Sequence, residues 1–216
     1  MISILLAIYN GEKYLRKSID SILNQTFKDW ELLVGFNGTS DSSKEIIKEY
    51  KDPRIKTFDY GDDKGKGKTL NKLIKESKYD WCAIQDDDDV WEKGKLKKQI
   101  KYICDYDVVG SFINYIDEKG FLIGSPNLSS SHNEIKRRSL AGSNQIANQS
   151  AIFKKSVVNS IGGWNENIEG IEDYDLWLRL LRCEYKFFNV PEYLCFHRLH
   201  NKSNFNVKEQ DISKIL

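Results

Sequence analysis

Residues 81–89 read WCAIQDDDD, an apolar run followed directly by four aspartates. The apolar residues predict a buried strand that delivers the aspartates together to its carboxyl end. Neighbouring carboxylates repel one another, and this repulsion favours a divalent cation between them. Oxygen ligands suit Mg²⁺ or Mn²⁺, which commonly bridge protein carboxylates to substrate phosphates. The alternative is a solvated acidic turn at the start of the next helix, because Asp is favoured near helix N-termini.

Length and charge place the chain among single-domain proteins with no bulk attraction to nucleic acid. Its 216 residues suit one α/β domain. Its formal net charge of +1 gives no general attraction to nucleic acid. Its four cysteines form no C-x-x-C pair, and a chain of this size needs no disulfides, so a reducing cytoplasm is expected. No apolar run approaches the ~18 residues of a membrane span. Residues 1–8 predict a strand rather than a signal peptide.

Strand and helix patterns alternate along the first half of the chain. Continuous apolar runs predict strands at residues 2–9, 30–36, 55–58 and 81–85. Apolar residues at helical spacing predict helices at 14–25, around 46–50 and around 70–74. This alternation favours a parallel sheet with helices on both faces. Ligands of such sheets bind beyond the carboxyl ends of the strands, so the loops at 10–13, 36–41 and 86–89 are expected to converge on one ligand.

The second half is less regular. Residues 108–116 and 121–123 predict a hairpin, and 129–133 a polar loop. Short strands are predicted at 152–153, 186–190 and 193–197, and a helix at 174–182.

Five motifs follow one another in order along the chain. They lie at residues 4–10, 15–27, 30–34 with 37–41, 84–91, and 162–166 with 172–179. In these motifs the chain resembles the family 2 glycosyltransferases, which are inverting enzymes. The resemblance extends from about residue 2 to residue 203.

The resemblance implies a GT-A fold, an α/β architecture with a Rossmann-like, mainly parallel sheet flanked by helices and a smaller mixed half on the acceptor side. One domain would span 1–216, with 1–105 binding the nucleotide-sugar, 106–204 binding the acceptor and 205–216 forming a polar tail. The implied reaction moves a hexosyl or N-acetylhexosaminyl group from a UDP-sugar to a hydroxyl of a glycan or lipid-linked saccharide. The implied location is the cytoplasm, at the inner face of the membrane. Peripheral membrane association and a homodimer are both left open.

The resemblance places Mn²⁺ or Mg²⁺ at the aspartate run. Asp88 would be the direct ligand, while Asp86 would face the ribose or the water shell of the metal. Asp87 fills the variable position among the donor-binding residues. Asp89 would either orient Asp88 or cap the following helix. His200 stands where the family often has a histidine near the metal or the diphosphate, with a plain surface histidine as the alternative.

Asp173 stands where the family places its general base, the group that takes the proton of the acceptor hydroxyl. Glu172 beside it would bind acceptor hydroxyls, and Trp164 would stack on an acceptor sugar. Read without the family, the two carboxylates are helix caps and the tryptophan is a packing residue.

The remaining donor-binding residues implied by the resemblance are Ala7, Tyr9, Asn10, Lys68 and Asn71. Lys68 belongs to a basic, glycine-containing segment at 64–68 that could contact a diphosphate. A solvated lysine-rich loop is the alternative.

The loop that would recognise the base departs from the family pattern. The family usually has two acidic residues before the glycine, where this chain has Phe36 and Asn37. Asn37 can still accept a hydrogen bond through its carbonyl oxygen, but it carries no charge and adds donors. Uridine is the first expectation, and another base stays open.

Three other functions remain as alternatives. A Mg²⁺-dependent phosphatase or nucleotidyltransferase could use an aspartate run, but Val90 fills the position where a haloacid-type phosphatase has Thr. A calcium- or glycan-binding module is another, although the run lacks the spaced Asp, Gly and Glu of a calcium-binding loop. The third is a catalytically impaired paralogue that binds the nucleotide-sugar.

Overall fold

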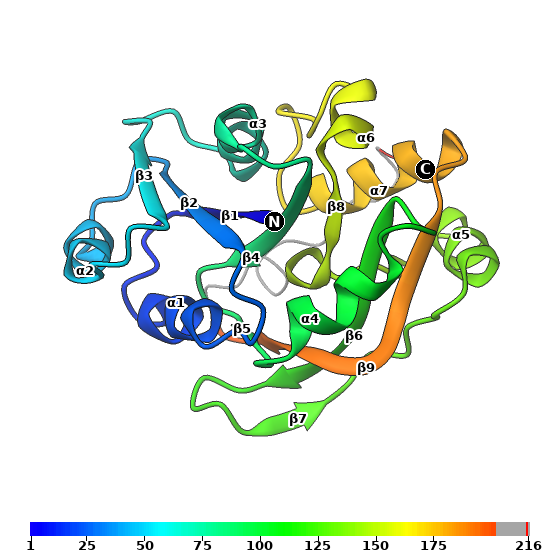
Figure 1. Cartoon of the computed structure of the whole chain (residues 1–216), viewed down its shortest axis with the longest axis horizontal. Coiled ribbons are helices and arrows are strands. Elements are labelled where there is room, and N and C mark those ends of the chain that lie inside the picture. The colour runs from blue at the N-terminus through cyan, green and yellow to red at the C-terminus, as the bar shows by residue number, and fades with distance from the viewer. Residues whose placement is uncertain (202–214, 216) are drawn as a thin grey trace.

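In the computed structural model, which describes residues 1–201 and 215, nine strands form one sheet with helices on both faces (Figure 1). The strands are β1 (Ile2–Ile8), β2 (Trp30–Phe36), β3 (Ile55–Asp59), β4 (Trp81–Asp86), β5 (Val90–Trp91), β6 (Val108–Ile116), β7 (Leu122–Gly124), β8 (Ile152–Lys154) and β9 (Phe187–Arg198). The helices are α1 (Leu15–Leu23), α2 (Ser43–Glu49), α3 (Lys66–Glu76), α4 (Lys95–Gln99), α5 (His132–Leu140), α6 (Lys155–Ser160) and α7 (Glu172–Arg182), with short 3₁₀ turns η1 (Ile100–Tyr102) and η2 (Asn148–Ser150). The tail predicted at 205–216 lies outside the described residues except for Ile215.

The first four strands are parallel and place three loops side by side. The strand order is β3-β2-β1-β4-β8-β6-β9-β5, with β7 paired to β6. In this register Ala7 of β1 lies opposite Gly35 of β2 on one side and Asp86 of β4 on the other. The carboxyl ends of β1, β2 and β4 therefore meet at one edge of the sheet, and the predicted α/β class with a mainly parallel sheet is confirmed.

The second half adds antiparallel pairings to this sheet. Strand β8 pairs antiparallel with both β4 and β6, and β5 pairs antiparallel with β9. Strands β6 and β9 pair in parallel, and β7 folds back on β6 as a hairpin. Through these pairings the last described strand returns next to the segment that follows β4.

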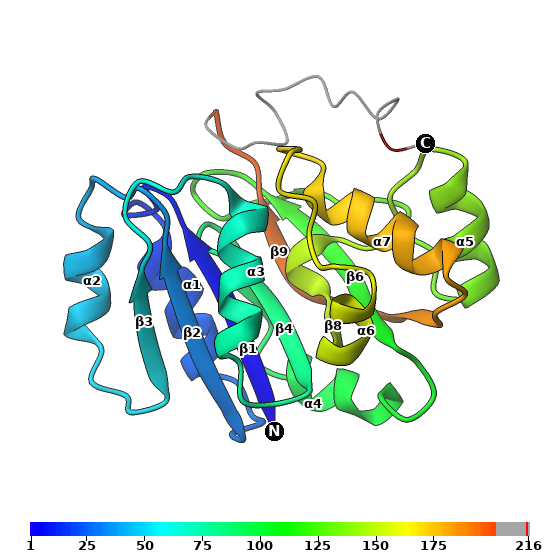
Figure 2. The same ribbon diagram turned by 90° about the horizontal axis from the view of Figure 1, so that it is seen from above.

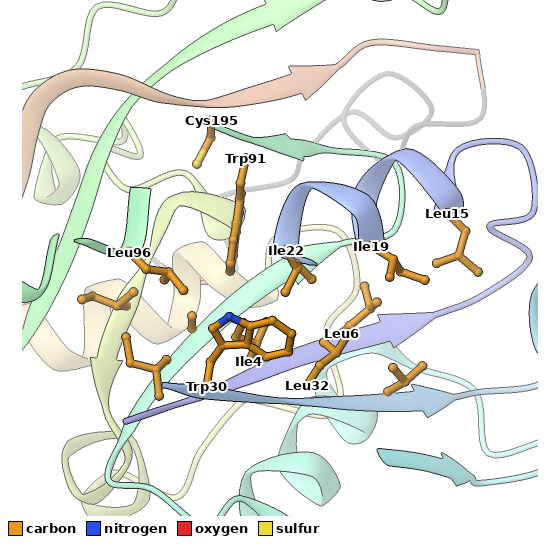
Figure 3. Close-up of a cluster of buried hydrophobic side chains, with 14 of the residues drawn as sticks. Ile4, Leu6, Leu15, Ile19, Ile22, Trp30, Leu32, Trp91, Leu96 and Cys195 are labelled. Atoms are coloured by element: carbon orange, nitrogen blue, oxygen red, sulfur yellow. The ribbon is translucent and has the colours of Figure 1, made fainter. Parts of the chain in front are cut away.

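Two hydrophobic cores cover the two faces of the sheet. Helices α1, α2 and α4 pack on one face, and α3, α5, α6 and α7 pack on the other. Figure 2 shows α3 in front of the sheet and α1 behind it. In the first core, Trp91 lies among Ile22, Leu96 and Trp30 (Figure 3). Its indole Nε1 donates to the carbonyl of Gln149 at 2.9 Å.

Strand β5 and helix α6 were not predicted from the sequence, and two predictions differ in their bounds. Helix α5 begins at residue 132, inside the predicted polar loop. The sequence did not reveal this helix, because it buries only Ile135 and Ser139 and therefore has a weak periodic pattern of apolar residues. The two strands predicted at 186–190 and 193–197 are one strand, β9. Its register on β6 shifts between Ser111 and Phe112, which lie opposite Val190 and Tyr193. This bulge accommodates Pro191, which has no N–H to donate to a ladder.

All four cysteines are free. None of the described helices has the length and apolar character needed to cross a bilayer.

Candidate active site

Asp86 lies at the centre of the converging loops. Its Oδ1 is 2.6 Å from Nζ of Lys66, at the start of α3. Nδ2 of Asn148, in η2, donates to the same oxygen at 3.2 Å. The Ser18 hydroxyl donates to the backbone carbonyl of Asp86 at 2.8 Å. Side chains from three separate elements therefore fix Asp86 at the end of β4, two through its carboxylate and one through its backbone carbonyl.

Asp87 lies against the loop that follows β1. A Cβ atom at Gly11 would come within 2.3 Å of Oδ2 of Asp87, so only glycine fits this close approach. Burial raises the pKa of Asp87 well above its usual value, and the negative charges of Asp88 and Asp86 raise it further. The nearby backbone of Tyr9 acts in the opposite direction and lowers this pKa. Asp87 thus ties the first loop to the aspartate run.

Asp88 and His200 meet, as the resemblance implies. Nε2 of His200 is 2.9 Å from Oδ2 of Asp88, and Nε of Arg198 donates to the Asp88 carbonyl at 3.0 Å. Burial raises the pKa of Asp88, but the hydrogen bond with His200 and nearby positive charges hold it below its usual value. A carboxylate and an imidazole are ligands that Mn²⁺ accepts.

A metal at this place would need further ligands. Among the described residues, no group of three or more His, Cys, Asp and Glu side chains is arranged to hold a metal ion. Magnesium sites commonly use one or two carboxylates and complete the shell with water and substrate phosphates. The donor set of Asp88 and His200 fits that pattern.

Asp89 anchors the last strand. It is fully buried, and its Oδ2 is 2.9 Å from Nδ1 of His197 while its Oδ1 accepts from the backbone N–H of Arg198 at 2.7 Å. Burial raises the pKa of Asp89 to about 6. Burial alone would lower the pKa of His197, but the charge of Asp89 and its hydrogen bond raise it to about 9. Helix α4 begins only at Lys95, so Asp89 does not cap it.

Glu172 and Asp173 begin α7, which packs on the same face of the sheet as α3. Burial raises the pKa of Asp173 to about 7; Glu172 adds to that rise, and Lys66 opposes it. Nδ2 of Asn144 donates to Oδ2 of Asp173 at 3.4 Å. Glu172 is buried, and its Oε2 has no hydrogen-bond partner within the described part of the chain. A carboxylate with a pKa near neutrality is suited to accept a proton at physiological pH.

Lys66 links the two acidic groups. Burial alone would lower its pKa, but the charges of Asp86, Glu172 and Asp173 raise it above its usual value. The lysine therefore stays protonated beside Asp86. Lys68, which the resemblance singled out, instead pairs with Asp63 at 3.2 Å. The basic segment was visible in the sequence, but the choice between its lysines depends on where α3 begins.

The first two loops are joined beside β2. Asn10 adopts a positive φ of 54°, and its Oδ1 accepts from the backbone N–H of Ser40 at 2.8 Å. Asn37 follows β2 and is only 4% exposed. Its Oδ1 is buried without a hydrogen bond from the described residues. Tyr9 is exposed, and Nζ of Lys64 lies 5.6 Å from the centre of its ring.

Two of the expected site residues make internal contacts. The side-chain amide of Asn71 donates to the backbone carbonyl of Trp164 and accepts from the backbone N–H of Trp164, both at 2.9 Å. It also donates to Glu166 at 2.9 Å. Trp164 is only 2% exposed, and its ring packs edge-on against Phe153. This packing does not support stacking of Trp164 on an acceptor sugar, and Asn71 connects α3 to the loop before α7.

Comparison with known proteins identifies the family. Residues 3–162 match the model of "Glycosyl transferase family 2". The chain belongs to this family. The O-antigen biosynthesis glycosyltransferase WbnJ of Escherichia coli is 38% identical over 94% of this chain and 81% of its own length. An uncharacterized glycosyltransferase of Methanocaldococcus jannaschii is 30% identical over 98% of this chain and 76% of its own.

A third relative of this glycosyltransferase family has a named reaction. It is WfaP of E. coli, a UDP-Glc:alpha-D-GlcNAc-diphosphoundecaprenol beta-1,3-glucosyltransferase, 30% identical over 93% of this chain and 78% of its own length.

Solved structures confirm the GT-A fold of this family 2 chain. S. aureus TarS 1–349 in complex with UDP-GlcNAc superposes with a TM-score of 0.77 at 17% identity, covering 96% of this chain and 61% of TarS. The mannosyltransferase PcManGT of Pyrobaculum calidifontis, in complex with GDP-Man and Mn²⁺, gives 0.73 at 14% identity, covering 94% and 58%. The chain thus spans about three-fifths of the length of these solved structures.

The structure adds three residues to the site that sequence reasoning did not assign. Asn148 and Lys66 both contact the carboxylate of Asp86. Arg198 donates a hydrogen bond to the backbone carbonyl of Asp88. Lys66 lay within the basic segment seen in the sequence. Asn148 and Arg198 carried no signal, because a polar residue outside a periodic pattern does not reveal its partner.

Proposed function

We propose that this family 2 glycosyltransferase is an inverting, metal-dependent enzyme that moves a sugar from a nucleoside-diphosphate sugar to a hydroxyl of a saccharide acceptor. The observation that carries the proposal is the ion pair of Lys66 with Asp86 at 2.6 Å, together with the electrostatic effect of Asp173 on the same lysine. The positive charge of Lys66 suits a negatively charged leaving group, and the carboxylate of Asp173 suits a proton acceptor. Both are needed for transfer by direct displacement.

The donor would bind along the edge formed by β1, β2 and β4. Asn37 supplies a buried carbonyl oxygen for the base, and Asp86 supplies a carboxylate for the ribose. Lys66 would contact the diphosphate, exchanging part of its ion pair with Asp86 for a phosphate oxygen. Mn²⁺ or Mg²⁺ held by Asp88 and His200 would neutralise charge on the diphosphate as it leaves.

The acceptor would approach from the side of α7. Asp173 removes the proton of the acceptor hydroxyl as that oxygen forms a bond to the anomeric carbon. The bond between the anomeric carbon and the phosphate oxygen breaks in the same step, and its electron pair leaves with the nucleoside diphosphate. Attack from the face opposite the leaving group inverts the configuration. Lys66 opposes the developing negative charge on the leaving group.

The relatives guide the choice of substrates. By its name, WfaP transfers glucose from a UDP-sugar to a diphosphoundecaprenol-linked GlcNAc, and WbnJ acts in O-antigen biosynthesis. We therefore propose a UDP-hexose or UDP-N-acetylhexosamine donor and a lipid-linked saccharide acceptor. The enzyme would meet such an acceptor at the cytoplasmic face of the membrane.

The test is a transfer assay with radiolabelled UDP-glucose, UDP-galactose and their N-acetylhexosamine counterparts, Mn²⁺, and a polyprenyl-diphosphate-linked GlcNAc. Transfer that stops on chelation of the metal supports the proposal. If nucleotide binds but no donor is consumed with any acceptor, the chain is an impaired nucleotide-sugar-binding paralogue. Thermal shift with UDP shows whether nucleotide binds when no transfer is seen, because a ligand that binds only the folded state raises its stability.

A further inference from the structure

The hairpin of β6 and β7 carries an exposed apolar segment. Phe121, Leu122 and Ile123 are consecutive and are 67%, 64% and 54% exposed. Figure 1 shows this hairpin at the rim of the molecule. Exposed apolar residues are ordinary when they are scattered, but a contiguous group marks a surface that contacts another apolar phase.

Both faces of the strand are apolar and exposed. Successive side chains of a strand point to opposite faces, so Leu122 and Ile123 lie on different sides of β7. Within the described residues, β7 pairs with β6 alone, and Leu122 lies opposite Ile116. A protein partner that packs on one face of a strand would leave the other face in water. A fluid apolar phase surrounds both.

The hairpin is held rigidly beside the candidate site. Oδ1 of Asp117 accepts from the backbone N–H groups of Lys119, Gly120 and Phe121 at 2.8 to 2.9 Å. Nη1 of Arg198 donates to the carbonyl of Asp117 at 3.0 Å, while Nε of the same guanidinium donates to the carbonyl of Asp88 at 3.0 Å. One buried side chain therefore joins the hairpin turn to the aspartate run.

The charges at the turn balance. Lys13 lies 2.6 Å from Glu118, and Asp117 is next to this pair with Lys119 two residues further on. Two acidic and two basic residues give the turn no excess charge for a strongly charged partner. Its exposed apolar side chains are therefore the groups available to contact a partner.

We propose that residues 121–123 insert into a lipid bilayer at the boundary between headgroups and acyl chains. A second copy of the chain is a poorer occupant, because stable protein interfaces use about 20–30 residues a side and this segment supplies three. Apolar insertion into a bilayer needs no such minimum and grows with the apolar area buried. The biological role of this membrane contact rests on the proposed function, because docking here would bring the candidate active site to a lipid-linked acceptor.

The experiment measures binding to vesicles by co-sedimentation. The probes are phosphatidylcholine vesicles, alone and with phosphatidylglycerol. The test variant combines Phe121→Ser, Leu122→Ser and Ile123→Ser. The matched control combines Leu140→Ser and Tyr193→Ser, two exposed apolar residues elsewhere. We expect the wild type and the control to bind both kinds of vesicle, with little gain from the anionic lipid. The test variant should bind at least about tenfold more weakly.

Two results would overturn the proposal: no binding of the wild type to vesicles, or equal binding by the wild type and the test variant. Thermal shift with UDP on the same samples reports the nucleotide site separately. Wild type that binds vesicles without responding to nucleotides would contradict the proposed function and leave the docking surface intact. Melting temperatures show that each variant is folded.

Discussion

Nζ of Lys66 lies 2.6 Å from Oδ1 of Asp86, and the two residues come from the start of α3 and the end of β4. In the proposed mechanism this pair would place a positive charge beside the leaving diphosphate. Because Glu172 and Asp173 also raise the pKa of this lysine, the charge persists at neutral pH. The pair gives a direct way to test the donor side of the site.

Lys66→Gln should weaken nucleoside diphosphate binding and cut the transfer rate by about 10²-fold or more, because it removes a charge that stabilises the leaving group. Lys68→Gln is the matched control, since Lys68 pairs with Asp63 at the surface. Calorimetry with UDP and steady-state kinetics measure both effects. Equal losses in the two variants would mean that the basic segment acts only through its overall charge.

Asp88→Asn should abolish transfer and make nucleotide binding independent of Mn²⁺. The substitution keeps the shape of the side chain and removes the charge that a divalent ion needs. Asp29→Asn serves as the control, because Asp29 is an exposed aspartate just before β2, at the end of the parallel strands opposite to the aspartate run. Titration of UDP with and without Mn²⁺ is the measurement. An Asp88→Asn enzyme with full activity would assign the aspartate run a structural role.

Asp173→Asn should leave donor binding nearly unchanged and reduce transfer by about 10²–10⁴-fold, the usual contribution of a general base. In the wild type, kcat/KM should fall by about tenfold per pH unit below pH 7, because burial and Glu172 raise the pKa of the base to about 7 and only its ionised form accepts a proton. Glu172→Gln, which removes a neighbouring negative charge, should lower that pKa and move the acidic limb to lower pH. An unchanged profile in Glu172→Gln would place the titrating group elsewhere.

Asn37→Asp should sharpen the preference for uridine. A carboxylate accepts more strongly from the ring N–H of uracil and repels a base edge that offers only acceptors. In the wild type we expect UDP to bind best, with a weak preference over GDP, CDP and TDP. Calorimetric comparison of the four diphosphates on both proteins, with Mn²⁺ present, is the measurement. Tight selectivity of the wild type for GDP would remove Asn37 from uridine recognition.

Asn71→Ala should destabilise the fold by about 1–3 kcal/mol, because it leaves the backbone N–H and carbonyl of Trp164 without their partner. Chemical denaturation measures the change. The variant should keep UDP affinity at temperatures where it is folded. A large loss of UDP affinity with unchanged stability would instead support the donor-binding role that the family resemblance gives Asn71.

The first half of the fold was predictable because its signals are local. The apolar runs of β1, β2 and β4 and the helices between them each bury a continuous face, and burial of this kind leaves a period in the sequence. Parallel order then places their carboxyl ends together. The aspartate run could be assigned to this edge of the sheet before any side-chain contact was known.

Contacts between distant residues could not be predicted in the same way. Arg198 is buried and donates to three backbone carbonyls, those of Asp88, Asp117 and Glu118. Its position in a run of mixed residues gave no indication of this. The sequence favoured packing for Trp164 and left sugar stacking open, because an aromatic residue outside a periodic pattern fits both. Only the side-chain packing distinguishes the two.

The dependence of the aspartate run on β9 also has a consequence for biosynthesis. Asp88 and Asp89 are held by His200 and His197, which follow them by 112 and 108 residues. A ribosome needs roughly 5–20 s to cover that distance. During this interval the nascent chain carries the acidic loop without its histidine and arginine partners. The loop therefore reaches its final geometry only when the last strand enters the sheet, however early the strands before it have formed.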